Sequence, residues 1–248
     1  MIIAANWKMN LDNEEAQALI NALNLRALDW KNLDVIFCPA APYLQSVRAK
    51  AHQNFHVGGQ YCHAEAKGAF TGDMSAAMLK DCGASHVIIG HSERRQYAQE
   101  QGQTLKQQAM RAIEAGLDVI FCVGEQLSDR QNGAEETVVA DQLADIAEFL
   151  KTGQVSIIAY EPVWAIGTGQ VASVPDIQAM HQFIKTECQR LAGDGRAPAI
   201  LYGGSVKSDN AEAILSAQAV DGALVGGASL DALGFQAICD EGQKLSTG

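Results

Sequence analysis

The chain alternates short apolar runs with longer amphipathic segments. Eight apolar runs recur at intervals of about 25 to 40 residues, and several are rich in Val and Ile without polar alternation. Strands that are buried on both faces of a parallel sheet have this pattern. The runs predict eight strands: Ile2–Asn6, Val35–Cys38, Phe55–Gly59, His86–Gly90, Val119–Gly124, Ser156–Tyr160, Ala199–Tyr202 and Gly222–Val225.

The amphipathic segments predict helices between these strands. Apolar residues of Gln103–Ala115 fall on one helical face, and Gly116 follows as a stop. Pro175 lies at the start of Val174–Leu191, where helices tolerate proline, and Ser173 precedes it as a candidate cap. Further predicted helices are Glu14–Ala27 and Glu135–Leu150.

Eight strand–helix units allow a doubly wound open sheet or a closed barrel. Edge strands of an open sheet are usually short or polar, whereas the first and last runs here are as apolar as the middle ones. We therefore expect an α/β protein, a (β/α)8 barrel with a closed eight-stranded parallel sheet and outer helices. Since no linker or low-complexity segment indicates a boundary, residues 1–248 are predicted to form one domain.

Composition and charge exclude several classes of partner. The 248-residue chain has a formal net charge of -11, and its 18 Lys and Arg are scattered, so we expect no nucleic-acid partner. No apolar run approaches the ~18 residues of a membrane helix, so no membrane partner is expected. The six cysteines include no C-x-x-C pair, which indicates reduced thiols in a cytoplasmic protein and no structural metal.

Polar residues and glycines gather directly after the predicted strands. In a barrel all these strand ends open onto one face, where such enzymes carry out their chemistry. Residues far apart in the sequence would then meet in one pocket, which is the main sign of an active site. The residues are Asn6, Lys8, His91, Glu93, Glu161, the turn Gly203-Gly204-Ser205 and the turn Gly226-Gly227.

Glu161 and His91 are candidates for acid–base chemistry. Pro162 holds Glu161 extended at the end of its strand, and apolar cover from the residues that follow would raise the pKa of this carboxyl. Ser92 would cap a short helix after His91, and the positive end of that helix would keep the imidazole neutral. Read separately, Glu161 also fits a solvated loop carboxylate and His91 a structural histidine.

Lys8 and the two glycine turns are candidates for anion binding. The Lys8 ammonium would pair with a substrate anion, with Glu93 as the partner that orients it. The backbone N–H groups of the turns at Gly203–Ser205 and Gly226–Gly227 would bind phosphate, as loops after the last two strands of barrels commonly do. An exposed lysine and plain tight turns are the alternatives.

Three other patterns do not support a site. Gly167–Ala172 fits a dinucleotide fingerprint but does not join a strand directly to its helix. The segment Gly203–Lys207 lacks the second glycine of a nucleophile elbow, so Ser205 is a poor hydrolase nucleophile. His52, His56 and His63 lie around the third strand, away from the other polar residues, and are expected to be a solvated cluster rather than metal ligands.

Five segments resemble the triosephosphate isomerase family, in that family's order and spacing and across the whole chain. They are Asn6–Asn10, Gly90–Arg95, Tyr160–Gly169, Tyr202–Val206 and Gly222–Leu230. The resemblance implies a TIM barrel and an enzyme without cofactors. Its substrates would be small triose phosphates, since the family interconverts dihydroxyacetone phosphate and D-glyceraldehyde 3-phosphate through an enediolate.

The resemblance also implies roles for matching residues. Glu161 would be the base and His91 the neutral electrophile, while Lys8 would stabilise the anionic substrate and Asn6 would help to position it. A lid over Pro162–Gly169 would close on the substrate. The phosphate site would comprise Gly167, Ser205, Gly226 and Gly227. Ile166 and Leu224 would be the apolar pair that closes over the base. Glu93 and Cys122 would be supporting residues.

Gly68–Gly72 resembles the loop tip that inserts into a neighbouring subunit in this family. Thr71 would brace the partner's active site, which implies a homodimer, and Phe70 has no good explanation in a monomer. Two departures from the family pattern are Tyr61, where asparagine is usual, and Gln170, where lysine is common. They put details of the dimer interface and of lid kinetics in doubt.

Two other functions remain to be weighed. A different phosphate-binding barrel enzyme would keep the glycine turns but replace Asn6, Lys8, His91 and Glu161. A catalytically silent barrel, acting as a binding protein, would be expected to lose at least one of these four. The sequence retains all four, which favours the isomerase.

Overall fold

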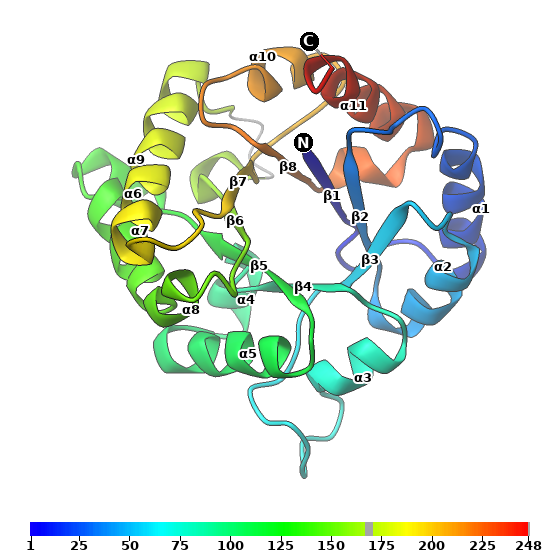
Figure 1. Ribbon diagram of the computed structural model, residues 1–248, viewed down its shortest axis with the longest axis horizontal. Coiled ribbons are helices and arrows are strands. Elements are labelled where there is room, and N and C mark those ends of the chain that lie inside the picture. The colour runs from blue at the N-terminus through cyan, green and yellow to red at the C-terminus, as the bar shows by residue number, and fades with distance from the viewer. Residues whose placement is uncertain (167–170, 248) are drawn as a thin grey trace.

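The computed structural model describes residues 1–166 and 171–247 as a closed barrel of eight parallel strands inside a ring of helices (Figure 1). Each strand pairs with the next, and β8 pairs with β1. The predicted closed barrel is therefore confirmed, and the alternative of a doubly wound open sheet is excluded. The strands are β1 Ile2–Asn6, β2 Asp34–Cys38, β3 Phe55–Gly59, β4 His86–Ile89, β5 Asp118–Val123, β6 Ile157–Tyr160, β7 Ala199–Tyr202 and β8 Gly222–Val225.

The helices follow the strands on the outside of the barrel. They are α1 Asn13–Asn24, α2 Leu44–Lys50, α3 Ala76–Asp81, α4 Ser92–Tyr97, α5 Gly102–Glu114, α6 Leu127–Gln131, α7 Glu135–Ala144, α8 Ala147–Lys151, α9 Val174–Ala192, α10 Ala211–Leu215 and α11 Ala232–Leu245, with short 3-10 turns η1 Ala41–Tyr43, η2 Val163–Ala165 and η3 Gly227–Leu230. Ser173 caps α9, as predicted, because its side chain accepts from the backbone N–H of Asp176.

The core has two layers, which explains the missing polar alternation. Ala4, Ile36, Ile88, Ile120 and Leu201 point into the barrel with other buried residues. The strand residues between them point outward and pack beneath the helices in a second cluster. Because both faces of each strand are buried, an apolar residue is favoured at every position.

Gly222 allows the barrel to close. A Cβ atom at this position would lie 1.8 Å from the carbonyl oxygen of Ile2, the residue that pairs with it across the β1–β8 seam. Only glycine permits such a close approach of two backbones.

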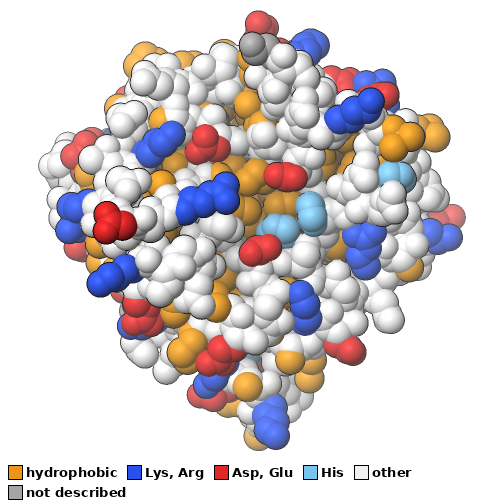
Figure 2. Space-filling model, in the orientation of Figure 1, with side chains coloured by type: hydrophobic (Ala, Val, Ile, Leu, Met, Phe, Trp, Pro, Cys, Tyr) orange, Lys and Arg blue, Asp and Glu red, His pale blue; other side chains and the backbone are white. Residues whose placement is uncertain are grey.

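The strand beginnings form the face shown in Figure 2, where two histidine side chains lie next to each other near the centre. His56 and His86 have ring centroids 5.2 Å apart and line a hollow there with Asp34 and Asp118. The three histidines that the sequence places around β3 are all partly exposed, and His52 packs on Phe55 while His63 packs on Phe70.

None of the helices in the described part of the chain combines the length and the apolar character that crossing a membrane requires.

Candidate functional site

A pocket of about 700 Å3 opens at the carboxyl ends of the strands. Its walls come from residues after β1, β4, β6, β7 and β8, which the barrel brings together from positions 6 to 228. Of the residues predicted for the site, the pocket is lined by Asn6, Lys8, His91, Glu93, Glu161, Ile166, Gly203, Gly204, Ser205, Leu224, Gly226 and Gly227.

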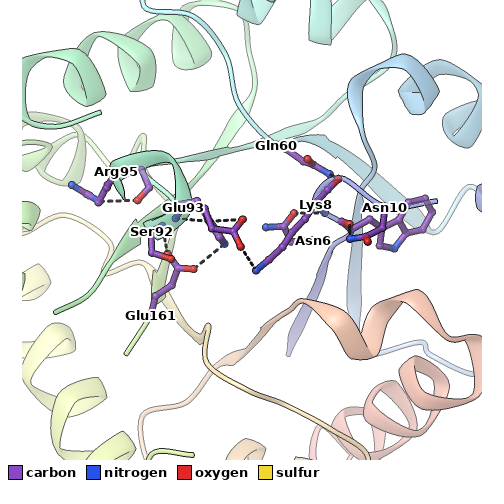
Figure 3. Close-up of polar contacts among 11 residues, drawn as sticks. Asn6, Lys8, Asn10, Gln60, Ser92, Glu93, Arg95 and Glu161 are labelled. Atoms are coloured by element: carbon purple, nitrogen blue, oxygen red, sulfur yellow. Dashed lines mark hydrogen bonds and ion pairs between the residues drawn. The ribbon is translucent and has the colours of Figure 1, made fainter. Parts of the chain in front are cut away.

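Glu161 lies directly after β6 and is only 2 % exposed. Its backbone N–H donates to the carbonyl of Val123 at 2.7 Å, which continues the β5–β6 pairing past the strand end. One carboxylate oxygen, Oε1, lies 2.9 Å from His91 Nε2, and the other, Oε2, accepts from the backbone N–H of Ser92 at 2.8 Å. These contacts hold the carboxylate in one orientation (Figure 3).

The pKa of Glu161 differs from the expectation. Burial does raise it, but the contacts with His91, the Ser92 N–H and the charge of Lys8 together lower the pKa of this carboxyl below its ordinary value. The prediction of a raised pKa considered only apolar cover and was wrong for this arrangement, because polar partners reach the carboxylate from two sides.

His91 itself is the N-cap of α4, so the prediction that Ser92 caps this helix was wrong. Its Nδ1 accepts from the backbone N–H of Glu93 at 3.2 Å, and a ring nitrogen that accepts a hydrogen bond carries no proton. This contact favours the neutral Nε2–H tautomer, which donates to Glu161. Burial lowers the pKa of His91, but the carboxylate of Glu161 outweighs burial and raises this pKa above its ordinary value, contrary to the expected lowering by the helix end.

Lys8 is held by three contacts at the pocket wall. It has a left-handed backbone, with φ 52°, which is costly for a residue other than glycine. Asn6 Oδ1 accepts from the Lys8 N–H at 3.0 Å, and Gln60 donates to the Lys8 carbonyl at 2.8 Å. The ammonium donates to Glu93 Oε1 at 2.7 Å, so Glu93 is the partner that the sequence indicated (Figure 3).

The two glycine turns, at Gly203–Ser205 and Gly226–Gly227, line the same pocket. Gly203 continues the β6–β7 pairing through its N–H to the carbonyl of Tyr160 at 2.7 Å. Ser205 Oγ donates to the carbonyl of Ala165 at 3.1 Å, which ties this turn to the segment after Glu161. A Cβ at Gly226 would lie 3.6 Å from Lys8 Cε, so the second turn is close to the ammonium.

The remaining predicted residues fall in three different places. Cys122 is fully buried in the barrel beside Glu161, and burial raises the pKa of its thiol far above the ordinary value. Thr71 is exposed on the loop between β3 and α3, which projects from the barrel, and it does not line the pocket (Figure 1). Gly167 and Gln170 lie outside the described residues.

Sequence reasoning missed four residues that support the site. Arg95 donates to the carbonyls of Gly90 and Cys122, and so joins the ends of β4 and β5. Glu125 is fully buried and accepts from Tyr160 and Trp164. The other two are Gln60 and the backbone N–H of Ser92. In the sequence, only Arg95 and Glu125 could have been found, because they are charged residues next to strand ends.

No group of three or more His, Cys, Asp or Glu within residues 1–166 and 171–247 is arranged to hold a metal ion. The arrangement provides a buried carboxylate, an imidazole whose single N–H points at that carboxylate, and an ammonium beside a glycine turn. Together these groups suit proton transfer on a small anionic substrate.

Comparisons with known proteins agree with this chemistry. The family model described as triosephosphate isomerase matches residues 1–242. A triosephosphate isomerase of Granulibacter bethesdensis is 44% identical over 243 residues, which cover 96% of this chain and 98% of the relative. Triosephosphate isomerases of Herpetosiphon aurantiacus, at 44% identity over 94% of this chain and 96% of the relative, and of Trichlorobacter lovleyi, at 45% over 96% of each, are similar as well.

Proposed function

Because this chain belongs to the triosephosphate isomerase family and interconverts dihydroxyacetone phosphate and D-glyceraldehyde 3-phosphate, we propose that Glu161 is its base and His91 its electrophile. The supporting observation is the 2.9 Å contact between His91 Nε2 and Glu161 Oε1 inside the pocket. A base and a hydrogen-bond donor that are adjacent can reach the C–H and the neighbouring carbonyl oxygen of one small substrate.

The substrate enters this arrangement by replacing one contact. Its carbonyl oxygen takes the Nε2–H of His91, which then no longer donates to Glu161. Glu161 loses its main polar partner but stays buried, so its pKa rises and it becomes a stronger base. It removes the proton from C1 and returns it to C2, while His91 and Lys8 stabilise the negative charge on the enediolate oxygens.

The phosphate occupies the far side of the pocket. Ser205, Gly226 and Gly227 present a hydroxyl and backbone groups there, and Gly226 lies close to the Lys8 side chain. The Lys8 ammonium then lies between the phosphate and the reacting carbons, held by Glu93, with Asn6 fixing its backbone. Ile166 and Leu224 provide apolar cover that excludes water from the enediolate, and Gly167 would add its N–H.

Glu161→Gln tests the base directly. The amide keeps the size of the side chain but cannot accept a proton, so we expect turnover to fall about a thousandfold or more. A coupled assay with glyceraldehyde 3-phosphate and a metal chelator measures this, and Glu14→Gln, an exposed carboxyl-to-amide change on α1, is the control. Near-normal turnover of Glu161→Gln would refute the assignment.

We also propose that the working unit is a homodimer in the cytoplasm. Phe70 is 42% exposed on the projecting loop, and Thr71 follows it. A second hollow of about 490 Å3, lined by Lys8, Glu93 and Tyr97 among others, offers a surface on which the loop of another subunit can dock. All six cysteines carry free thiols, which suits a reducing compartment.

A further inference from the structure

Glu161 lies between two hollows of the molecule. The front pocket holds the groups described above, and a rear hollow of about 380 Å3 lies among α4, the start of α5, α6 and α7. Among the described residues that line these two spaces, Glu161 is the only one that they share.

The two carboxylate oxygens have partners that belong to different hollows. Oε1 contacts His91, which lines the front pocket, and Oε2 accepts from the N–H of Ser92, which lines the rear hollow. In Figure 3, Arg95 lies on the side of Ser92 away from Lys8, and it also lines the rear hollow. Glu161 therefore borders a hollow other than the pocket that the substrate would occupy.

The wall of the rear hollow is fixed by polar contacts. The Gln142 amide donates to the Gly124 carbonyl at 2.9 Å and accepts from the Gly124 N–H at 2.8 Å. Arg95 donates to the carbonyls of Gly90 and Cys122 at 2.7 and 2.8 Å. Because the side chains of Gln142 and Arg95 are engaged in these bonds, they do not fill the rear hollow.

The charges of the rear hollow exclude substrate but admit water. Asp129, Asp141 and Asp145 line it, together with Glu100 and a single guanidinium, Arg95. Such a lining repels a phosphorylated dianion, whereas water and hydrated protons are not repelled. The front pocket has the opposite character, with Lys8 and the glycine turns.

We propose that the rear hollow is the route by which solvent protons exchange with the carboxyl proton of Glu161 during turnover. The inference rests on the proposed role of Glu161 as base. After the base takes a proton from C1, the carboxylic acid gives this proton to rear water and receives another. It then protonates C2, so no net proton is gained or lost and the product carries a hydrogen from solvent.

Isotope content of the product tests this route. Isomerisation in D2O gives product with hydrogen or deuterium at the carbon that received the proton, and NMR measures the deuterated fraction at low conversion. Val138 on α7 lines the rear hollow and is partly buried, so Val138→Phe and Val138→Trp fill it. We expect the deuterated fraction to fall about twofold or more while kcat/KM stays unchanged.

Two further variants keep the test decisive. Val138→Ala widens the hollow without steric risk, so it should raise the deuterated fraction even if the bulky variants fail to fold. Thr137→Phe places the same ring on the exposed side of α7 and should change nothing. An unchanged deuterated fraction in folded Val138→Trp and in Val138→Ala would overturn the rear route. It would leave the base intact, which only an active Glu161→Gln would refute.

Discussion

The position of Glu161 depends on two glycines that pass close to it. A Cβ at Gly124 would lie 1.8 Å from the Glu161 carbonyl oxygen, and one at Gly203 would lie 2.9 Å from Glu161 Cγ. Gly124 therefore fixes the backbone of Glu161, and Gly203 limits the space for its side chain. Gly124 follows β5 and Gly203 follows β7, the two strands on either side of β6, so the barrel itself sets these approaches.

Gly203→Ala should reduce catalysis more than stability. The new methyl group pushes the Glu161 side chain away from His91, and a displacement near 1 Å is enough to lower kcat about tenfold or more. Steady-state kinetics and thermal unfolding of the purified variant measure both quantities. Gly234→Ala, within α11, is the matched control and should have normal kinetics. A normal kcat for Gly203→Ala would show that the side chain of Glu161 has more freedom than the structure indicates.

At this scale the sequence predicts which residues meet but not how they bond. Asn6, Lys8, His91 and Glu161 were found because parallel strands in a barrel place their carboxyl ends together. The Ser92 N–H and the left-handed Lys8 were missed, because backbone donors and dihedral angles leave no residue-type signal. The sign of the Glu161 pKa shift was missed for the same reason.

Among the elements, α9 connects the strands of the site through one buried histidine. The His181 ring packs against Tyr160 at 5.8 Å and Tyr202 at 6.2 Å, the last residues of β6 and β7. Its Nδ1 lies 3.2 Å from the carbonyl of Ala219, which fixes the ring. The residues that follow these tyrosines are the proposed base and the first glycine turn, so His181 supports both.

His181 should make the fold sensitive to acid. Burial lowers the pKa of His181 to about 4, well below the value near 6.5 of an unfolded chain. As pH falls from about 6.5 to 4, the unfolded state binds the proton first, so up to about 3 kcal/mol of stability is lost.

His181→Gln removes this titration and should flatten the dependence on pH. Urea unfolding at fixed protein concentration, at pH 7.5 and pH 5, measures the difference, with the partly exposed His52→Gln as the control. Equal loss of stability on acidification in the wild type and in His181→Gln would contradict the role of His181.

Element boundaries show where pattern reasoning ends. Glu135–Leu150 was predicted as one helix, but α7 ends at Ala144 and α8 begins at Ala147. The buried residues Val139, Leu143, Ile146 and Leu150 keep helical spacing across the break. Since no Gly or Pro marks it, the break follows from packing on the barrel, which the local sequence does not encode.

For the molecule as a whole, closure was predictable because it follows from a property of every strand. Each apolar run has two buried faces, and the first and last runs leave no candidate for an edge. Gly222 completes the closure, since only glycine fits against Ile2 at the seam. The proposed assembly of several copies is harder to predict from the sequence, because it depends on a surface of one chain that only a second chain would cover.

The projecting loop between β3 and α3 is the surface that we propose for this contact. Phe70 packs on His63, with ring centroids 4.1 Å apart, yet remains 42% exposed. His63 Nε2 lies 3.8 Å from Asp73, and Tyr61 donates to the same carboxylate, so the loop is held in shape before any partner binds. A preformed loop with an exposed aromatic ring loses little entropy on docking.

Phe70→Asp should therefore separate the proposed dimer. A charge in the docked interface is costly to desolvate, so the variant should sediment as a monomer, and its turnover should fall about a hundredfold because Lys8 and Glu93 lose their cover. Analytical ultracentrifugation and activity across a dilution series measure both effects. Leu233→Asp makes the same change at a residue 76% exposed on α11 and should leave both unchanged. If Phe70→Asp sediments like the wild type with full activity, the loop is not the contact between subunits, and the exposure of Phe70 needs another explanation.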